Sequence, residues 1–136
     1  MTGPRRAVDE TAWWFAKAEA TFAFLLRDFD AVVVERYSHF KGNYIDYQGP
    51  GFRFDVECAP DWNSLFGSLA IWRPDGTLYV AGDIDELLIE IAPETDWRFI
   101  ADSGPVDRVA VAEAMELWAG GLRGHLPTMT AAALGG

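Results

Sequence analysis

The apolar residues near the start of the chain recur at the spacing of an α-helix. The recurring set is Trp14, Ala18, Phe22, Leu25 and Phe29. This pattern predicts a helix over residues 9–29 with one strongly apolar face. Further aromatic side chains at Trp13, Phe15 and Phe24 widen the stripe beyond what one core-facing surface needs. We therefore expect some of them to contact a second element or a partner.

Residues 31–81 instead show the two-residue alternation of β-strands. The clearest strand is 52–58, where apolar even positions alternate with Arg53, Asp55 and Glu57. The other strands are predicted at residues 31–37, 44–47, 65–72 and 78–81. Turn signals at Lys41-Gly42-Asn43 and over residues 73–77 make the connections short. Short connections favour antiparallel neighbours, so we expect a meander of about five strands.

Helical spacing returns after the predicted strands. Residues 83–92 are predicted to form a short helix, although their apolar residues fit a strand equally well. Pro93 ends either element. Residues 94–104 are expected to form a loop with a brief extended piece at residues 97–100.

The last predicted helix begins at Gly104-Pro105 and runs up to Ala119. Gly120-Gly121 is a typical signal for the end of a helix, so we expect the helix to stop there. Residues 131–136 are then expected to be frayed.

These elements define an α+β fold, in which an antiparallel meander is packed by an N-terminal and a C-terminal helix. The 136 residues suffice for one domain, residues 1–136, and we expect an ordered core over about residues 9–127. Half of the residues are hydrophobic and 14% are aromatic. This composition is typical of a globular domain and excludes disorder across most of the chain.

The charge balance restricts the classes of partner. Eleven Lys and Arg stand against 21 Asp and Glu, so the formal net charge is -10 at pH 7. A surface of this sign repels the phosphates of nucleic acids and anionic lipids. We expect neither a nucleic-acid partner nor a membrane partner, and no apolar run approaches the roughly 20 residues that cross a bilayer.

The only cysteine is Cys58, so the chain cannot form an intramolecular disulfide. Cys58 ends the alternating strand on its apolar side, and we assign it to the core. Charged residues interrupt the apolar stretch that follows Arg5 and Arg6, so no export signal is expected. These features together favour the cytoplasm.

No group of residues in the sequence has the spacing of a catalytic or metal site. The two histidines, His39 and His125, are predicted in different elements, and neither has a second ligand at metal-binding spacing. Adjacent residues of a strand point to opposite faces, so Ser38 cannot pair with His39 as a nucleophile and base. Asp55 and Glu57 share one sheet face, but a wet face alone explains them. We expect no catalytic residue, metal or cofactor.

One acidic stretch contains no basic residue and can attract a cationic partner. Its members are Asp83, Asp85, Glu86, Glu90, Glu94 and Asp96. The alternative interpretation is a solvated helix face followed by a loop. Trp62 lies in the predicted loop Pro60-Asp61-Trp62-Asn63, where an indole serves either as an interface anchor or as a lid on the core.

The order of elements resembles a known group of proteins. Phe24-Leu25-Leu26-Arg27-Asp28-Phe29 ends the first helix, Trp72-Arg73-Pro74-Asp75-Gly76 follows a Tyr-rich meander, and Leu122-Arg123-Gly124-His125-Leu126-Pro127 follows the last helix. In this layout residues 20–127 resemble the small acidic bacterial immunity proteins of polymorphic toxin systems and their uncharacterised relatives. The resemblance implies a cytoplasmic protein that masks a cognate toxin through an acidic surface. No shared motif carries a functional residue over.

The sequence leaves three hypotheses for function. The first is a non-enzymatic binding protein that engages a basic partner, such as a toxin, through the acidic stretch and Trp62. The second is a small-molecule binder or minor enzyme with a pocket between sheet and helices, near His39, Tyr44 and Tyr47. The third is a homo-oligomer joined by the surplus aromatic residues of the first helix.

Overall fold

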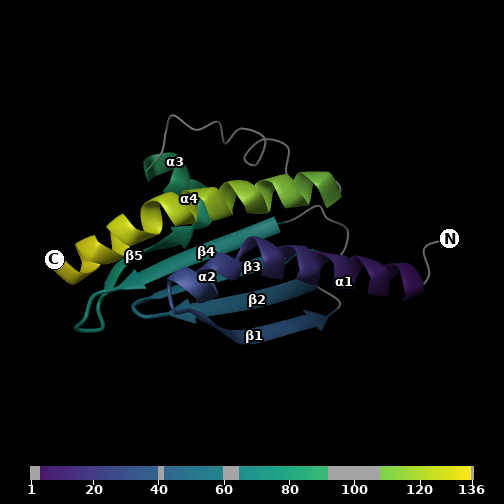
Figure 1. The fold of residues 1–136 in the computed structure, drawn as a ribbon, viewed down its shortest axis with the longest axis horizontal. Coiled ribbons are helices and arrows are strands. Elements are labelled where there is room, and N and C mark those ends of the chain that lie inside the picture. The colour runs from purple at the N-terminus through teal and green to yellow at the C-terminus, as the bar shows by residue number, and fades with distance from the viewer. Residues whose placement is uncertain (1–3, 40–41, 60–64, 92–107, 136) are drawn as a thin grey trace.

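The computed structural model describes residues 4–39, 42–59, 65–91 and 108–135 of the chain. Its elements are α1 (Pro4–Thr21), α2 (Ala23–Asp28), β1 (Val32–His39), β2 (Gly42–Gly49), β3 (Phe52–Cys58), β4 (Leu65–Trp72), β5 (Leu78–Asp83), α3 (Ile84–Ile91) and α4 (Arg108–Gly135). Figure 1 shows two layers, in which α1, α2 and α4 lie across one face of a single sheet. The predicted α+β class and its packing by the first and last helices are confirmed.

The five strands follow one another across the sheet in the order β1-β2-β3-β4-β5, and every neighbouring pair is antiparallel. The predicted meander is therefore confirmed, and β5 extends beyond its predicted end at Ala81 to Asp83. At the start of β2, Gly42 has a φ of 141°, a conformation that favours glycine. A β-bulge shifts the register of β1 against β2 between Val33 and Glu35.

The predicted first helix is interrupted at Phe22. α1 ends at Thr21, and Phe22 has φ -101° and ψ 11°, after which α2 begins at Ala23. The ring of Phe22 is fully buried, with its centroid 4.9 Å from that of Phe54 and 6.1 Å from that of Tyr47. The interruption thus accompanies the packing of an aromatic ring against the inner face of the sheet, and the predicted apolar face of the helix remains buried.

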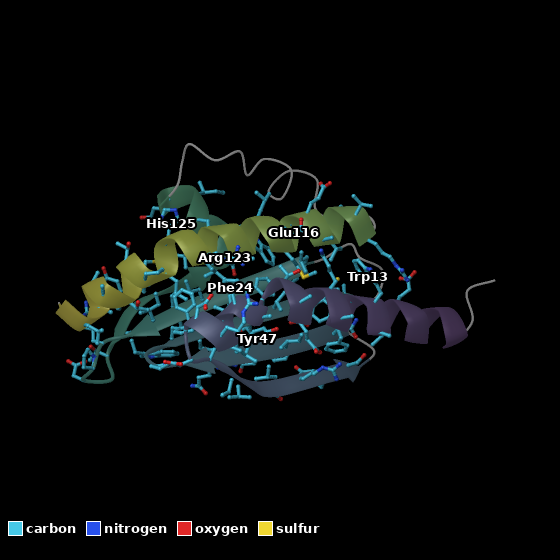
Figure 2. The ribbon with its side chains drawn as sticks, in the orientation of Figure 1. Trp13, Phe24, Tyr47, Glu116, Arg123 and His125 are labelled. Carbon is cyan, nitrogen blue, oxygen red and sulfur yellow. The ribbon has the colours of Figure 1, made fainter. Side chains whose placement is uncertain are left out.

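The surplus aromatic residues of α1 and α2 are used within the chain. Phe15 and Phe24 are buried, and the guanidinium carbons of Arg36 and Arg123 lie 4.1 Å and 4.6 Å from their ring centroids. Trp13 is half-buried, and Figure 2 shows it on α1 on the side facing α4. The expectation of a second element in contact with these rings is confirmed. The surplus rings that the homo-oligomer hypothesis invoked are therefore buried or half-buried within the chain.

The last helix is longer than predicted. α4 is continuous over residues 108–135, so the expected stop at Gly120-Gly121 is wrong, and the helix includes residues 131–135, where fraying was expected. Buried side chains continue beyond Gly121 at Leu122, Leu126 and Ala133. Their burial outweighs the glycine penalty of about 1 kcal/mol per residue. His125, expected after the helix, lies within it (Figure 2).

The core lies between the inner face of the sheet and the helices. Cys58 is fully buried there, as predicted. The glycine at position 67 makes room for a large ring, since a Cβ atom there would lie 3.0 Å from the Trp118 ring and 2.6 Å from Ile84 Cγ2. Trp118 itself is 1% exposed. The bare backbone of β4 at Gly67 is therefore what lets α4 approach the sheet.

The predicted short helix at residues 83–92 is confirmed as α3, which begins at Ile84. Ile84, Leu87 and Leu88 are its buried residues. The predicted loop at residues 94–104, its extended piece and the start of the last helix at Gly104-Pro105 lie outside the described residues. Among the residues that are described, no helix combines the length and apolar character that crossing a membrane requires.

Candidate functional site

The face of the sheet that points away from the helices carries a row of acidic side chains. Glu35 pairs with Asp46, Asp46 with Asp55, Asp55 with Ser68, and Ser68 with Asp83. Residues directly opposite each other in a sheet project to the same side. Four carboxylates and one hydroxyl therefore cross all five strands in a single line, which we call the acidic row.

One carboxylate of the acidic row is neutralised by an arginine on the same face. Arg53 donates from Nε to Asp46 Oδ1 at 2.9 Å, and its Nη2 lies 2.7 Å from Oδ2. The same Nη2 donates to the Tyr44 hydroxyl oxygen at 3.1 Å. Hydrogen bonding to Asp46 and to Tyr44 raises the pKa of Arg53, and Asp46 contributes most. Asp46 is only 3% exposed, so the guanidinium fork is what makes this buried charge tolerable.

The negative charge of Asp55 destabilises the folded protein. Partial burial raises the pKa of its carboxyl group, and the neighbouring charges of Asp46 and Glu57 act in the same direction. Arg53 and a hydrogen bond with Ser68 lower the pKa of Asp55 but do not cancel the rise. The acidic row thus includes a carboxylate whose negative charge opposes folding.

The raised pKa of Asp55 leads to a testable prediction for the variant Asp55→Asn. A raised carboxyl pKa contributes stability that is complete below the ordinary pKa of aspartate and is lost as the pH rises through the raised value. The side chain in the Asp55→Asn variant is uncharged at every pH, so the variant does not lose stability as the pH rises. We therefore expect it to melt at a higher temperature than the wild type at neutral pH. The two melting temperatures should converge as the pH falls to about 3. Thermal melts recorded across this range check it, and equal melting temperatures at neutral pH would contradict it.

Aromatic and apolar side chains border the acidic row. Tyr37 and Tyr44 stack with ring centroids 4.9 Å apart. Phe66 on β4 is 58% exposed, and Tyr79 on β5 is also exposed. Exposed aromatic residues beside charges are typical of protein interfaces, where they supply contact area.

The same face contains a hollow of about 330 Å³ over β3, β4 and β5. Its walls include Asp55, Asp83 and Trp72, and small side chains lie between them at Ser68 and Ala70. The hollow therefore opens directly on the acidic row.

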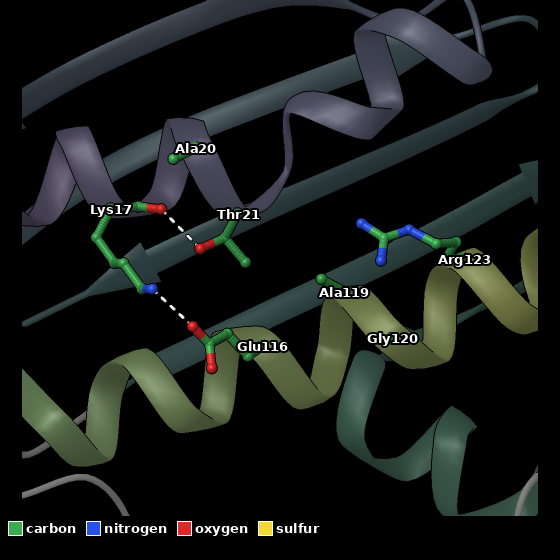
Figure 3. Close-up of a pocket in the computed structure, with 7 residues that line it drawn as sticks. All are labelled: Lys17, Ala20, Thr21, Glu116, Ala119, Gly120 and Arg123. Atoms are coloured by element: carbon green, nitrogen blue, oxygen red, sulfur yellow. Dashed lines mark hydrogen bonds and ion pairs between the residues drawn. The ribbon is translucent and has the colours of Figure 1, made fainter.

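A second hollow, of about 360 Å³, lies between α1 and α4 (Figure 3). Lys17 Nζ donates to Glu116 Oε1 at 2.6 Å across it, and the Thr21 hydroxyl donates to the Lys17 carbonyl oxygen. Arg123, at the other end, lies over the ring of Phe24. The lysine charge is already paired and Thr21 is already bonded, so this hollow presents little free binding chemistry. The sheet face is the stronger candidate site.

The structure separates the acidic residues that the sequence grouped together. Asp83 belongs to the acidic row, whereas Asp85, Glu86 and Glu90 belong to α3, where the Glu86 amide donates to Asp85 Oδ1 at 3.0 Å. Glu86 and Glu90 are exposed. The remaining predicted partner-binding residues, Glu94, Asp96 and Trp62, lie outside the described residues.

The residues of the predicted small-molecule pocket do not converge. Tyr44 lies on the outer face of the sheet, hydrogen-bonded to Arg53. Tyr47 lies on the inner face (Figure 2), where its hydroxyl is buried without a partner and burial raises its pKa. His39 pairs with Gly42 through the backbone of β1. The two tyrosines thus face opposite sides of the sheet and cannot line one pocket.

The outer face of the sheet is an acidic surface that combines carboxylates with exposed aromatic side chains. Within the described part of the chain, no three His, Cys, Asp or Glu side chains are grouped closely enough to hold a metal ion. The fold and the site together define an α+β protein with an acidic sheet face, which no described helix covers. No known family model, curated protein or solved structure matches the chain.

Proposed function

We propose that this protein binds a basic protein partner through the outer face of its sheet. The observation that carries the proposal is the acidic row of Glu35, Asp46, Asp55 and Asp83, which Arg53 alone offsets among the described strand residues of that face. Opposite charge on a partner lowers the repulsion among these carboxylates and speeds the encounter.

Two further observations support an interface. Exposed aromatic residues border the acidic row, so a partner can bury apolar area as well as pair charges. The pKa of Asp55 is raised, so its negative charge destabilises the fold, and a basic partner would offset this destabilisation. Both features are typical of surfaces that bind charged proteins.

The specific partner we propose is a toxin that the protein masks in the cytoplasm. This part of the proposal rests on the resemblance of the order of elements in the sequence to the immunity proteins of polymorphic toxin systems. Co-purification of the tagged protein from its own host, followed by mass spectrometry, identifies the partner. We expect a stoichiometric basic protein whose reading frame lies beside that of this chain. Recovery of an acidic partner would contradict the proposal.

Once the partner is identified, paired variants test the proposed surface. Glu35→Gln with Glu57→Gln removes two charges from the outer sheet face, and we expect association at low salt to slow by about tenfold. Glu86→Gln with Glu90→Gln removes two charges from exposed positions of α3 and serves as the matched control. Stopped-flow association at several salt concentrations measures both pairs. Equal slowing by the two pairs would show that net charge matters and that the sheet face does not.

A further inference from the structure

The hollow on the outer face has a defined arrangement of groups. Ser68 on β4 pairs with Asp55 on one side and with Asp83 on the other. Since neighbouring strands lie about 4.8 Å apart, the two carboxylates stand on strands roughly 10 Å apart with a hydroxyl between them. Ala70 and Ala81, which pair with each other, add only methyl groups to the floor. Trp72 contributes an indole to the wall.

The charges around the hollow are not balanced within the described residues. Arg53 also lines it and its charge acts on Asp55, but its Nε and Nη2 are bonded to Asp46 and Tyr44. Within the part of the chain that the structure describes, neither Asp55 nor Asp83 forms a salt bridge. The hollow therefore presents two carboxylates and a hydroxyl oxygen to whatever enters it.

We propose that this hollow receives an arginine side chain of the basic partner, with the guanidinium held between Asp55 and Asp83. The proposal rests on the proposed function and deepens it by naming the group that is recognised. A volume of about 330 Å³ is near the lower end of pocket sizes and suits one long side chain.

Arginine fits the arrangement better than lysine. A guanidinium is planar and has five donors, so it can bind two carboxylates at opposite edges and stack on an indole at the same time. The ammonium of lysine is a compact, strongly hydrated charge that cannot span two acceptors across a serine. The methyl floor of Ala70 and Ala81 suits the apolar stem of an arginine side chain.

The test uses the full chain and a small probe. N-acetyl-arginine amide is titrated into isotope-labelled protein, and amide shifts are followed by NMR. We expect saturable shifts at Ser68, Ala81 and Asp83, with binding about tenfold tighter than that of the uncharged N-acetyl-citrulline amide. Asp83→Asn should weaken arginine binding several-fold. Glu113→Gln, which removes an exposed charge on α4, should not.

A second titration separates failure of this inference from failure of the proposed function. Two peptides are compared at low salt, one alternating Arg with Gly and one alternating Lys with Gly. If both bind the sheet face equally and the arginine amide gives no saturable shift in the hollow, the arginine site is overturned and the proposed function stands. If neither peptide shifts the sheet face, both proposals are overturned. Preferential binding of the arginine peptide, lost in Asp83→Asn, supports the inference.

Discussion

Replacing Arg53 with leucine is expected to lower the free energy of unfolding by about 3 kcal/mol at neutral pH. The Asp46 side chain is only 5% exposed, and the substitution leaves its carboxylate without the fork of hydrogen bonds that now neutralises it. We place the value at the lower end of the range for broken buried pairs, because the Arg53 side chain is 42% exposed and water shares its charge. Urea denaturation followed by circular dichroism measures the loss.

A double variant separates the cost of an unpaired charge from the loss of packing. Arg53→Leu combined with Asp46→Leu removes both charges, and we expect most of the lost stability to return. The coupling energy from the four proteins of this cycle reports the worth of the pair. A double variant no more stable than Arg53→Leu would show that the aliphatic stem of Arg53, and not its charge, stabilises the sheet.

Replacing Trp118 with alanine is expected to cost about 4 kcal/mol of folding stability. Its indole fills the space above Gly67, where β4 has no side chain to close the gap. The surrounding backbone cannot collapse into so large a cavity, because Gly67 belongs to an interior strand paired on both sides. Equilibrium unfolding in urea measures the effect.

The matched control for Trp118→Ala is Phe66→Ala. Phe66 precedes Gly67 on β4 but points to the outer face and is 58% exposed. We expect its truncation to change stability by no more than about 0.5 kcal/mol. A loss from Phe66→Ala comparable with that from Trp118→Ala would mean that the outer face is covered, which would also weaken the proposed interface.

The sequence predicted the meander well because each strand has a local signal. The alternation in residues 52–58 and the turn over residues 73–77 both come from neighbours in the chain. The end of the last helix could not be predicted in the same way. Gly120 and Gly121 favour a stop locally, and only the tertiary burial of Leu122 and Leu126 shows why the helix continues.

The acidic row could not be predicted, although every member was visible in the sequence. Its residues come one from each of several strands, so only the register brings Glu35, Asp46 and Asp55 into line. Sequence reasoning correctly placed Asp55 on a wet face but had no means of finding its neighbours. It grouped Asp83 with α3 by proximity along the chain, whereas pairing with Ser68 assigns it to the sheet.

The bulge in β1 has a consequence for how the protein behaves at high concentration. β1 is an outermost strand, and its three consecutive valines, Val32, Val33 and Val34, are 58%, 40% and 48% exposed. A flat, apolar strand with unpaired backbone groups is a template on which another chain can add and aggregate. The register shift between Val33 and Glu35 interrupts that template, and the following carboxylate repels an identical strand. The bulge and the carboxylate of Glu35 thus both oppose the pairing of two molecules edge to edge.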